Sequence, residues 1–249
     1  MPELVYPPVI AAAKTMFRVL DLRLTVEGSH HVPRTGGAVL ASNHVSYLDF
    51  IFCGYGAHAS GRLVRFMAKH EVFAHKVSGP LMRGMKHIPV NRRAGAGSYS
   101  TAVDALRRGE VVGVFPEATI SRSFTVKDLK NGAARMAQEA AVPLLPVALW
   151  GTQRLWTKGR PRTLTRRHTP ITILVGEPID PADHADANAL SAELKTRLTA
   201  LVDRAQRAYP DTPAGPDDSW WQPAHLGGTA PTPEEALALD RGGRRTPAA

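Results

Sequence analysis

Two side chains that can exchange a proton stand five positions apart near the start of the chain. His44 and Asp49 fall in the stretch Ala-Ser-Asn-His-Val-Ser-Tyr-Leu-Asp-Phe, where a short apolar run gives way to helix-like sequence. A helix that begins between them can turn the Asp49 carboxylate back toward the imidazole, fix its tautomer and stabilise the imidazolium once the ring has accepted a proton. The pattern therefore favours a general base with an orienting acid.

The same residues also fit a purely structural role. Ser46 precedes Asp49 by three residues, which is the spacing of a capping box, so Asp49 can simply close a helix N-terminus. His44 can likewise be a satisfied histidine at the end of a strand. A triad that uses Ser46 as nucleophile is not expected, because the sequence has no G-x-S-x-G elbow.

Two further polar stretches could bind a substrate. The segment Phe-Pro-Glu-Ala-Thr-Ile-Ser-Arg-Ser follows a predicted strand and carries Glu117, Thr119 and Arg122, and such groups suit a polar ligand at the carboxyl edge of a sheet. Arg92 lies between a glycine-containing loop and a predicted helix N-terminus, which suits a phosphate. The alternative for both is a solvated loop, and neither matches a nucleotide-binding fingerprint.

Residues 153–168 form a basic stretch with six Lys or Arg, no acid and Trp156. Each cation near an anionic surface contributes ~1 kcal/mol of attraction. Together with the net charge of +9, the stretch indicates either a solvated loop or contact with an anionic membrane surface. Nucleic acid is not expected, because aromatic residues make up only 6% of the chain and form no stripe among the basic ones.

Further features of the sequence limit the classes of protein to which the chain can belong. Cys53, the single cysteine, lies in an apolar run, so we expect a core residue, no internal disulfide and a reducing compartment. No Cys/His cluster with metal-ligand spacing is present, so no metal is predicted. No apolar run reaches the roughly 18–20 residues of a membrane span, and the N-terminus lacks a signal peptide. We therefore expect a protein of the cytoplasm, free or resting on a membrane face.

Predicted strands and helices alternate along the chain, which favours one layered α/β domain with a mixed, largely parallel sheet flanked by helices. The predicted strands are residues 22–26, 38–41, 63–68, 87–90, 111–115, 142–150 and 171–176. The predicted helices are residues 7–20, 46–57, 98–109 (with Ser98 as N-cap), 130–140 and 187–208, plus a short helix before a turn at 78–80.

The two ends of the chain differ from this domain. We divide the sequence into a membrane-associating helix (residues 1–21), the α/β domain (22–209) and a Pro/Gly-rich tail (210–249). The first helix is amphipathic and partly basic, so it either packs on the domain or lies in a membrane interface. The tail contains Trp220-Trp221, which we expect to dock on the domain, with membrane contact as the alternative.

The order of the polar stretches resembles a known family. Asn43-His44 to Asp49, then residues 84–92, then Phe115-Pro116-Glu117, then Val-Pro-Leu-Leu-Pro-Val at 142–147 is similar to the four sequence blocks of the glycerolipid acyltransferases. The resemblance is strongest to bacterial 1-acylglycerol-3-phosphate acyltransferases, and the tail resembles actinobacterial members. It covers roughly residues 35–180.

The resemblance implies an enzyme that moves a fatty acyl group from acyl-CoA, or from acyl carrier protein, to the free hydroxyl of lysophosphatidate, giving phosphatidate without cofactor or metal. His44 would be the general base and Asp49 would orient it. Glu117, Thr119, Arg122 and Arg92 would contact the acceptor. A backbone amide of the second block, or else Lys69, would stabilise the oxyanion. A peripheral position on the cytoplasmic face of the cell membrane follows for such a substrate.

The third block departs from the family pattern, which commonly reads Phe-Pro-Glu-Gly-Thr-Arg-Ser. Here Ala118 replaces the glycine, and Ile120-Ser121 intervene before Arg122. Because this loop should contact the head group, the alternative acceptor is another lysolipid or a glycolipid. A more distant alternative is a non-enzymatic module that binds anionic lipid or nucleic acid.

Overall fold

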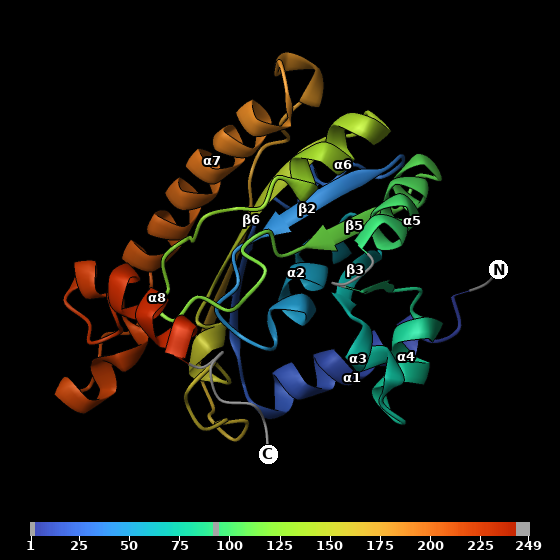
Figure 1. Ribbon diagram of the computed structural model, residues 1–249. Coiled ribbons are helices and arrows are strands. Elements are labelled where there is room, and N and C mark those ends of the chain that lie inside the picture. The colour runs from blue at the N-terminus through green and yellow to red at the C-terminus, as the bar shows by residue number, and fades with distance from the viewer. Residues whose placement is uncertain (1–2, 92–94, 243–249) are drawn as a thin grey trace.

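Seven strands form one sheet in the computed structural model of the chain, which describes residues 3–91 and 95–242 (Figure 1). The spatial order is β1-β7-β6-β2-β5-β3-β4, and every neighbouring pair is parallel except β6 and β7. The expected α/β class with a mixed, largely parallel sheet is therefore confirmed. The strands are β1 (Arg23–Glu27), β2 (Ala38–Ser42), β3 (Val64–Lys69), β4 (Ile88–Val90), β5 (Val111–Val114), β6 (Leu144–Trp150) and β7 (Pro170–Val175).

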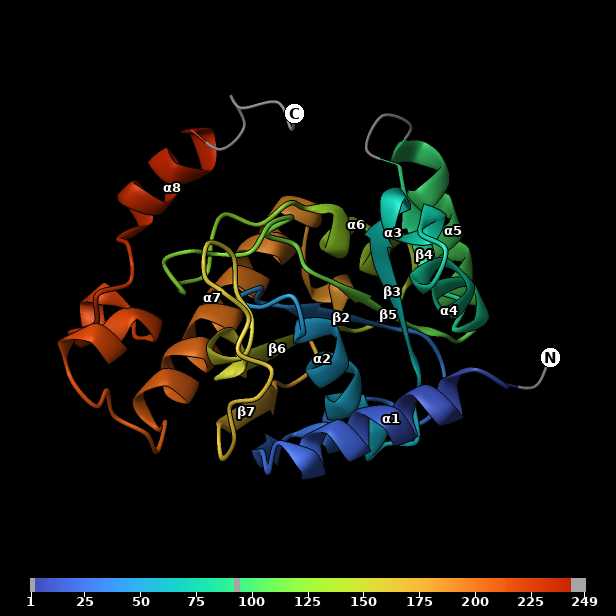
Figure 2. The same cartoon turned by 90° about the horizontal axis from the view of Figure 1, so that it is seen from below.

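Helices cover both faces of this sheet (Figures 1 and 2). They are α1 (Tyr6–Val19), α2 (Asp49–His58), α3 (His70–Ala74), α4 (Ser78–Gly84), α5 (Gly95–Arg107), α6 (Gly132–Ala140), α7 (Ala187–Arg207) and α8 (Pro233–Gly242). Short 3-10 segments connect them at η1 (Ser29–His31), η2 (Thr152–Arg154), η3 (Pro181–Asp183), η4 (Pro216–Trp221) and η5 (Ala224–Leu226).

Strand β2 shows how the apolar runs of the sequence produce this layering. Successive side chains of a strand point to opposite faces, so Leu40 joins the cluster under α1 and α2 while Val39 joins the cluster under α5, α6 and α7. All five residues of β2 are buried. A strand covered on both faces has no polar side, which is why residues 38–41 are apolar throughout.

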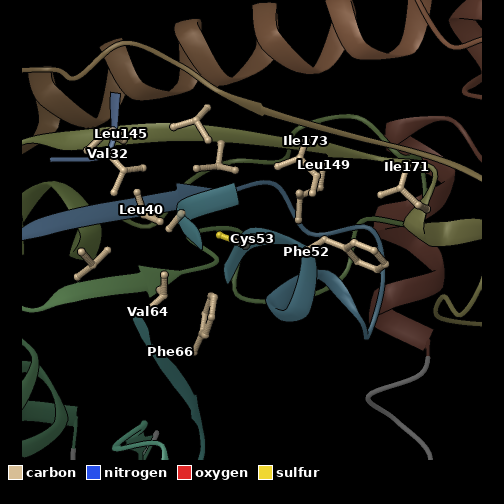
Figure 3. Packing of buried hydrophobic residues seen from close by; sticks show 14 of the residues in the cluster. Val32, Leu40, Phe52, Cys53, Val64, Phe66, Leu145, Leu149, Ile171 and Ile173 are labelled. Carbon is tan, nitrogen blue, oxygen red and sulfur yellow. The ribbon is translucent and has the colours of Figure 1, made fainter. Parts of the chain in front are cut away.

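Figure 3 shows the first of these clusters, in which Phe52 and Cys53 of α2 lie beside Leu149, Ile171 and Ile173 from β6 and β7. Cys53 is fully enclosed, and burial raises the pKa of its thiol far above the ordinary value. The cysteine is thus the small core residue that its apolar surroundings predicted.

Two predicted element boundaries are wrong. Ser98 is not an N-cap, because α5 already begins at Gly95, and the Ser98 hydroxyl instead donates to the Pro89 carbonyl at 2.8 Å. Residues 78–80 are not a turn but the first residues of α4. Proline is well accepted there, since the first-turn N–H groups have no partner inside the helix.

The C-terminal tail packs on the domain through both of its tryptophans, Trp221 as a buried residue and Trp220 as a partly buried one. Trp221 is 2% exposed and lies in a cluster with Trp150, Leu198 and Val202. The Arg154 guanidinium lies 4.5 Å from the centre of its indole ring, within cation–π range.

The N-terminal helix α1 also packs on the domain, through Tyr6 and Phe17. Leu4 and Val19, near its two ends, are exposed. Within residues 3–91 and 95–242, none of the helices has both the length and the hydropathy that a membrane span requires.

Candidate active site

His44 and Asp49 are in direct contact at the carboxyl end of β2. The strand ends at Ser42, α2 begins at Asp49, and the chain between them folds back so that His44 Nδ1 lies 2.9 Å from Asp49 Oδ2. The Asp49 side chain is completely buried, whereas that of His44 is 20% exposed. The helix start between the two residues therefore produces the contact that their spacing predicted.

The Asp49 carboxylate also binds the backbone of the segment that leads into α2. Its Oδ2 accepts from the backbone N–H groups of Val45 and Ser46, both at 2.7 Å, and its Oδ1 accepts from the Thr152 hydroxyl at 2.6 Å. A buried carboxylate needs hydrogen-bond donors, and these three supply them. The N-cap of α2 is Leu48, without a side-chain hydrogen bond, so Asp49 holds the segment before the helix and does not cap α2 itself.

The His44 ring is fixed on two sides. Because Nδ1 donates to the Asp49 carboxylate, Nε2 is the basic nitrogen of the neutral imidazole. Phe115 stacks on the ring with 4.3 Å between centroids and 24° between the planes. The imidazole thus has one defined orientation and one free basic nitrogen in the neutral form.

Glu117 holds the backbone of His44. Its Oε1 accepts from the His44 N–H at 2.9 Å, and its Oε2 accepts from the Lys127 N–H at 3.2 Å. The residue is 5% exposed, and this burial raises the pKa of its carboxyl to about 8, although the two N–H groups favour the ionised form. The geometry makes Glu117 a tether between His44 and the loop after β5, and its head-group role stays a prediction.

The loop after β5 also binds the backbone carbonyl of His44. The Ser121 N–H donates to the His44 carbonyl at 2.7 Å. To follow this path the backbone takes φ +60° at Ala118, a left-handed conformation that costs a residue with a Cβ about 1–2 kcal/mol. The alanine that replaces the family's glycine therefore adopts the glycine conformation.

Arg122 and Thr119 are joined through residues that no sequence motif marked. The Lys127 ammonium donates to the Thr119 hydroxyl at 2.8 Å and to Asp240 Oδ2 at 3.0 Å. Arg122 Nε and Lys158 Nζ lie 3.3 and 2.6 Å from Asp240 Oδ1. Three cations thus surround one carboxylate from the tail helix α8.

Of the other predicted site residues, the structure describes Lys69 but not Arg92. Lys69, the last residue of β3, is exposed and lines the same cavity as His44. Arg92 lies outside the described residues. Thr152 and Lys127 were missed by sequence reasoning: Thr152 follows the fourth block by only a few residues, whereas Lys127 carries no spacing signal at all.

An apolar cavity of about 1100 Å³ opens beside His44. It runs between α1, α2, α4 and β3. Its apolar lining includes Val9, Ile10, Ala13, Met16, Phe17, Tyr47, Phe50, Ile51, Tyr55, Val64, Phe66, Val72, Leu81, Met82, Met85, Phe115, Met136 and Trp156. A space of this volume and apolar lining suits a hydrocarbon chain with its reactive end at the imidazole.

In the part of the chain that the structure describes, no group of three or more His, Cys, Asp or Glu side chains could hold a metal ion. The chemistry that the geometry supports is proton transfer by His44 beside an apolar cavity.

Comparisons with known proteins identify the family. A family model described as Acyltransferase matches residues 23–150. The 1-acyl-sn-glycerol-3-phosphate acyltransferase of Bacillus subtilis is 31% identical over 191 residues, covering 74% of this chain and 86% of the relative. The chloroplastic 1-acyl-sn-glycerol-3-phosphate acyltransferase LPAT1 of Arabidopsis thaliana is 26% identical, and the match spans 73% of this chain but only 49% of that longer protein.

A solved structure shares the fold. The crystal structure of the 1-acyl-sn-glycerophosphate (LPA) acyltransferase PlsC from Thermotoga maritima matches with a TM-score of 0.71 and 25% identity, covering 82% of this chain and 81% of that one. The resemblance inferred from the four blocks is confirmed. The chain belongs to the acyltransferase family and groups with its 1-acyl-sn-glycerol-3-phosphate acyltransferases.

Proposed function

We propose that the protein transfers a fatty acyl group from acyl-CoA to the free hydroxyl of lysophosphatidate, giving phosphatidate. The observation that carries this proposal is the His44–Asp49 pair at the mouth of a large apolar cavity. The names of the relatives, which act on 1-acyl-sn-glycerol 3-phosphate, support the choice of acceptor.

The proposed reaction is a direct displacement. His44 Nε2 removes the proton of the acceptor hydroxyl while its oxygen attacks the thioester carbonyl carbon. The tetrahedral intermediate then expels the thiolate, which takes up the proton from the imidazolium. One C–O bond forms and one C–S bond breaks, so no acyl-enzyme is needed. The Asp49 carboxylate, 2.9 Å from Nδ1, stabilises the imidazolium between the two proton transfers.

Binding of the two substrates is divided between the cavity and the loops. The apolar cavity would hold an acyl chain. Arg122 and Thr119, with Arg92 from the second block, would bind the acceptor's phosphate. A backbone N–H near the second block, with Lys69 as the second choice, would stabilise the oxyanion. An acyl carrier protein is the alternative donor, because it presents the same thioester.

We also propose a peripheral position on the cytoplasmic membrane face. Apolar side chains at the cavity's outer rim, Tyr47, Phe50, Val72 and Leu81, are exposed. Arg160 and Arg162 of the basic stretch are exposed as well. The cations would attract anionic lipid, and the apolar side chains would enter the headgroup region of the membrane. Acyl chains could then pass directly between the bilayer and the cavity.

The test is turnover by the His44→Ala variant with an acyl-CoA donor and lysophosphatidate. Loss of a general base should reduce kcat roughly a hundredfold or more. The matched control is His225→Ala, which removes an exposed histidine of the tail and should leave kcat unchanged. Near-normal kcat in His44→Ala at an unchanged unfolding midpoint would contradict the mechanism.

The altered third block supports one second candidate, an acyltransferase for a different lysolipid. A mixture of lysolipids, analysed by mass spectrometry of the products, separates the two. Preference for an uncharged acceptor would argue against the phosphate roles of Arg92 and Arg122.

A further inference from the structure

The strongest feature that the proposed reaction leaves unused is Asp240 of α8. Its side chain is 6% exposed, and it forms three ion pairs, with Arg122, Lys127 and Lys158. Burial by itself would favour the protonated acid, but hydrogen bonds from Lys158 and Lys127 lower its pKa to about 2. A charged carboxylate from the tail is therefore seated among cations of the domain.

The three cations lie on segments that also hold the catalytic pair. Arg122 follows Ser121, whose N–H binds the His44 carbonyl. Lys127 shares the Glu117 carboxylate with the His44 N–H. Lys158 follows Thr157, whose hydroxyl donates to the Val45 carbonyl at 2.6 Å. The cluster is thus built on the loops that frame His44.

The charge balance of this cluster favours a ligand that carries more negative charge than the Asp240 carboxylate. One carboxylate supplies a single negative charge to three positive ones. A phosphate monoester carries about −1.5 to −2 near neutral pH and offers three acceptor oxygens. It can therefore accept from all three cations and neutralise more of their charge than Asp240 does.

Few groups of helix α8 hold it on the domain. All ion pairs between α8 and the rest of residues 3–91 and 95–242 involve Asp240. Only Ala236 and Asp240 are buried among the described residues of α8, while Leu237 and Leu239 are both 49% exposed. The helix stands at the edge of the molecule (Figure 2), so its release exposes little apolar surface.

We propose that Arg122, Lys127 and Lys158 form a phosphate-monoester site that Asp240 occupies as an internal ligand, and that the acceptor's phosphate binds by displacing α8. This inference rests on the proposed function for the identity of the acceptor. It adds Lys127 and Lys158 to the head-group contacts, and it makes α8 a cover that only a phosphate-bearing acceptor removes efficiently.

The binding test uses the full chain and sn-glycerol 3-phosphate, without any thioester. Hydrogen exchange of the α8 amides should become faster when this monoester is added. Asp240→Asn should lower the Kd for sn-glycerol 3-phosphate on the order of fivefold, and Lys158→Met should raise it. Glu234→Gln is the matched control, because it removes one negative charge from the exposed first turn of the same helix and should leave the Kd unchanged.

Two further ligands, inorganic phosphate and phosphatidylglycerol vesicles, test which kind of phosphate group the site binds. Inorganic phosphate should release α8 at higher concentration, and phosphatidylglycerol vesicles, which carry only a phosphodiester, should not. Release by these vesicles alone, or an unchanged Kd in Asp240→Asn, would overturn the inference.

The same variants separate this inference from the proposed function. If wild-type protein acylates lysophosphatidate but sn-glycerol 3-phosphate does not change the hydrogen-exchange rate of the α8 amides, the inference fails and the function stands. If sn-glycerol 3-phosphate releases α8 but lysophosphatidate is not acylated, the site stands and the proposed function fails.

Discussion

Asp49 accepts more hydrogen bonds than the orientation of a histidine requires. Its two oxygens accept from His44 Nδ1, two backbone N–H groups and the Thr152 hydroxyl. The N–H bonds fix the carboxylate to the segment before α2, and the fixed carboxylate then fixes the imidazole. The hydrogen bonds of one buried carboxylate thereby set the orientation of the general base.

This double role predicts the behaviour of Asp49→Asn. The asparagine oxygen can still accept from the backbone N–H groups, and its amide can donate to the Thr152 hydroxyl, so the unfolding midpoint should change little. The negative charge beside the imidazolium is lost, so kcat should fall on the order of 10²-fold or more. Steady-state kinetics with thermal unfolding checks both expectations.

Thr152→Val is the comparison variant, because it removes one donor from Oδ1 but leaves the charge next to His44. Its kcat should fall much less than that of Asp49→Asn. Equal losses in the two variants would show that Asp49 acts by packing and hydrogen bonding rather than through its charge.

At this scale the sequence predicts contacts that are local and misses those that are not. The His44–Asp49 contact follows from one helix start between neighbours in sequence. The Thr152 hydroxyl reaches Asp49 from 103 positions away, and only the pairing of β6 with β2 brings it there. Spacing within a motif carries no information about such a partner.

Among the elements, α1 determines the shape of the cavity. Seven of its residues line the space beside His44: Tyr6, Val9, Ile10, Ala12, Ala13, Met16 and Phe17. The amphipathic pattern of residues 7–20 predicted the helix itself but left packing on the domain and lying in a membrane interface equally open. Its buried Phe17, stacked on Phe52 of α2 with 5.1 Å between centroids, shows that α1 packs on the domain.

The cavity wall predicts an effect of Ala13→Phe on acyl chain length. A phenyl ring at this position fills part of the apolar space, and each methylene that can no longer be buried forfeits about 0.8 kcal/mol. Products formed from mixed acyl-CoA donors should therefore shift toward shorter chains, as measured by mass spectrometry.

Ala11→Phe provides the control for added hydrophobicity, because Ala11 is exposed on the same helix. It should leave the chain-length distribution unchanged. A similar shift in both variants would mean that α1 acts through general membrane binding and not as a cavity wall.

Over the whole molecule, the N-terminus, the second block and the sheet meet at Arg65 and His87. Arg65 of β3 forms ion pairs with Glu3 and Glu110 and donates to the Met85 carbonyl at 2.9 Å. His87 Nδ1 accepts from the Phe66 N–H at 3.1 Å. The alternation of strands and helices predicted the layered fold, but this polar junction inside it depends on the order of strands in the sheet, which local pattern does not encode.

The junction makes stability depend on pH through His87. Burial, with the Arg65 charge adding to it, lowers the pKa of His87 from 6.5 to about 4. Between these values the unfolded chain binds a proton that the folded chain does not, so the free energy of unfolding decreases as the pH is lowered from 6.5 toward 4. The total loss from this residue is about 3 kcal/mol.

His87→Asn isolates this contribution, because the asparagine oxygen can replace Nδ1 as the acceptor for the Phe66 N–H but does not titrate. Denaturant unfolding at a series of pH values should show the wild-type protein losing its advantage over the variant between pH 6.5 and 4, and a constant difference above that range. The comparison cancels the other titrating groups, which both proteins share. If the two curves stay parallel down to pH 4, the buried imidazole is not the group through which acid weakens the junction at Arg65 and His87.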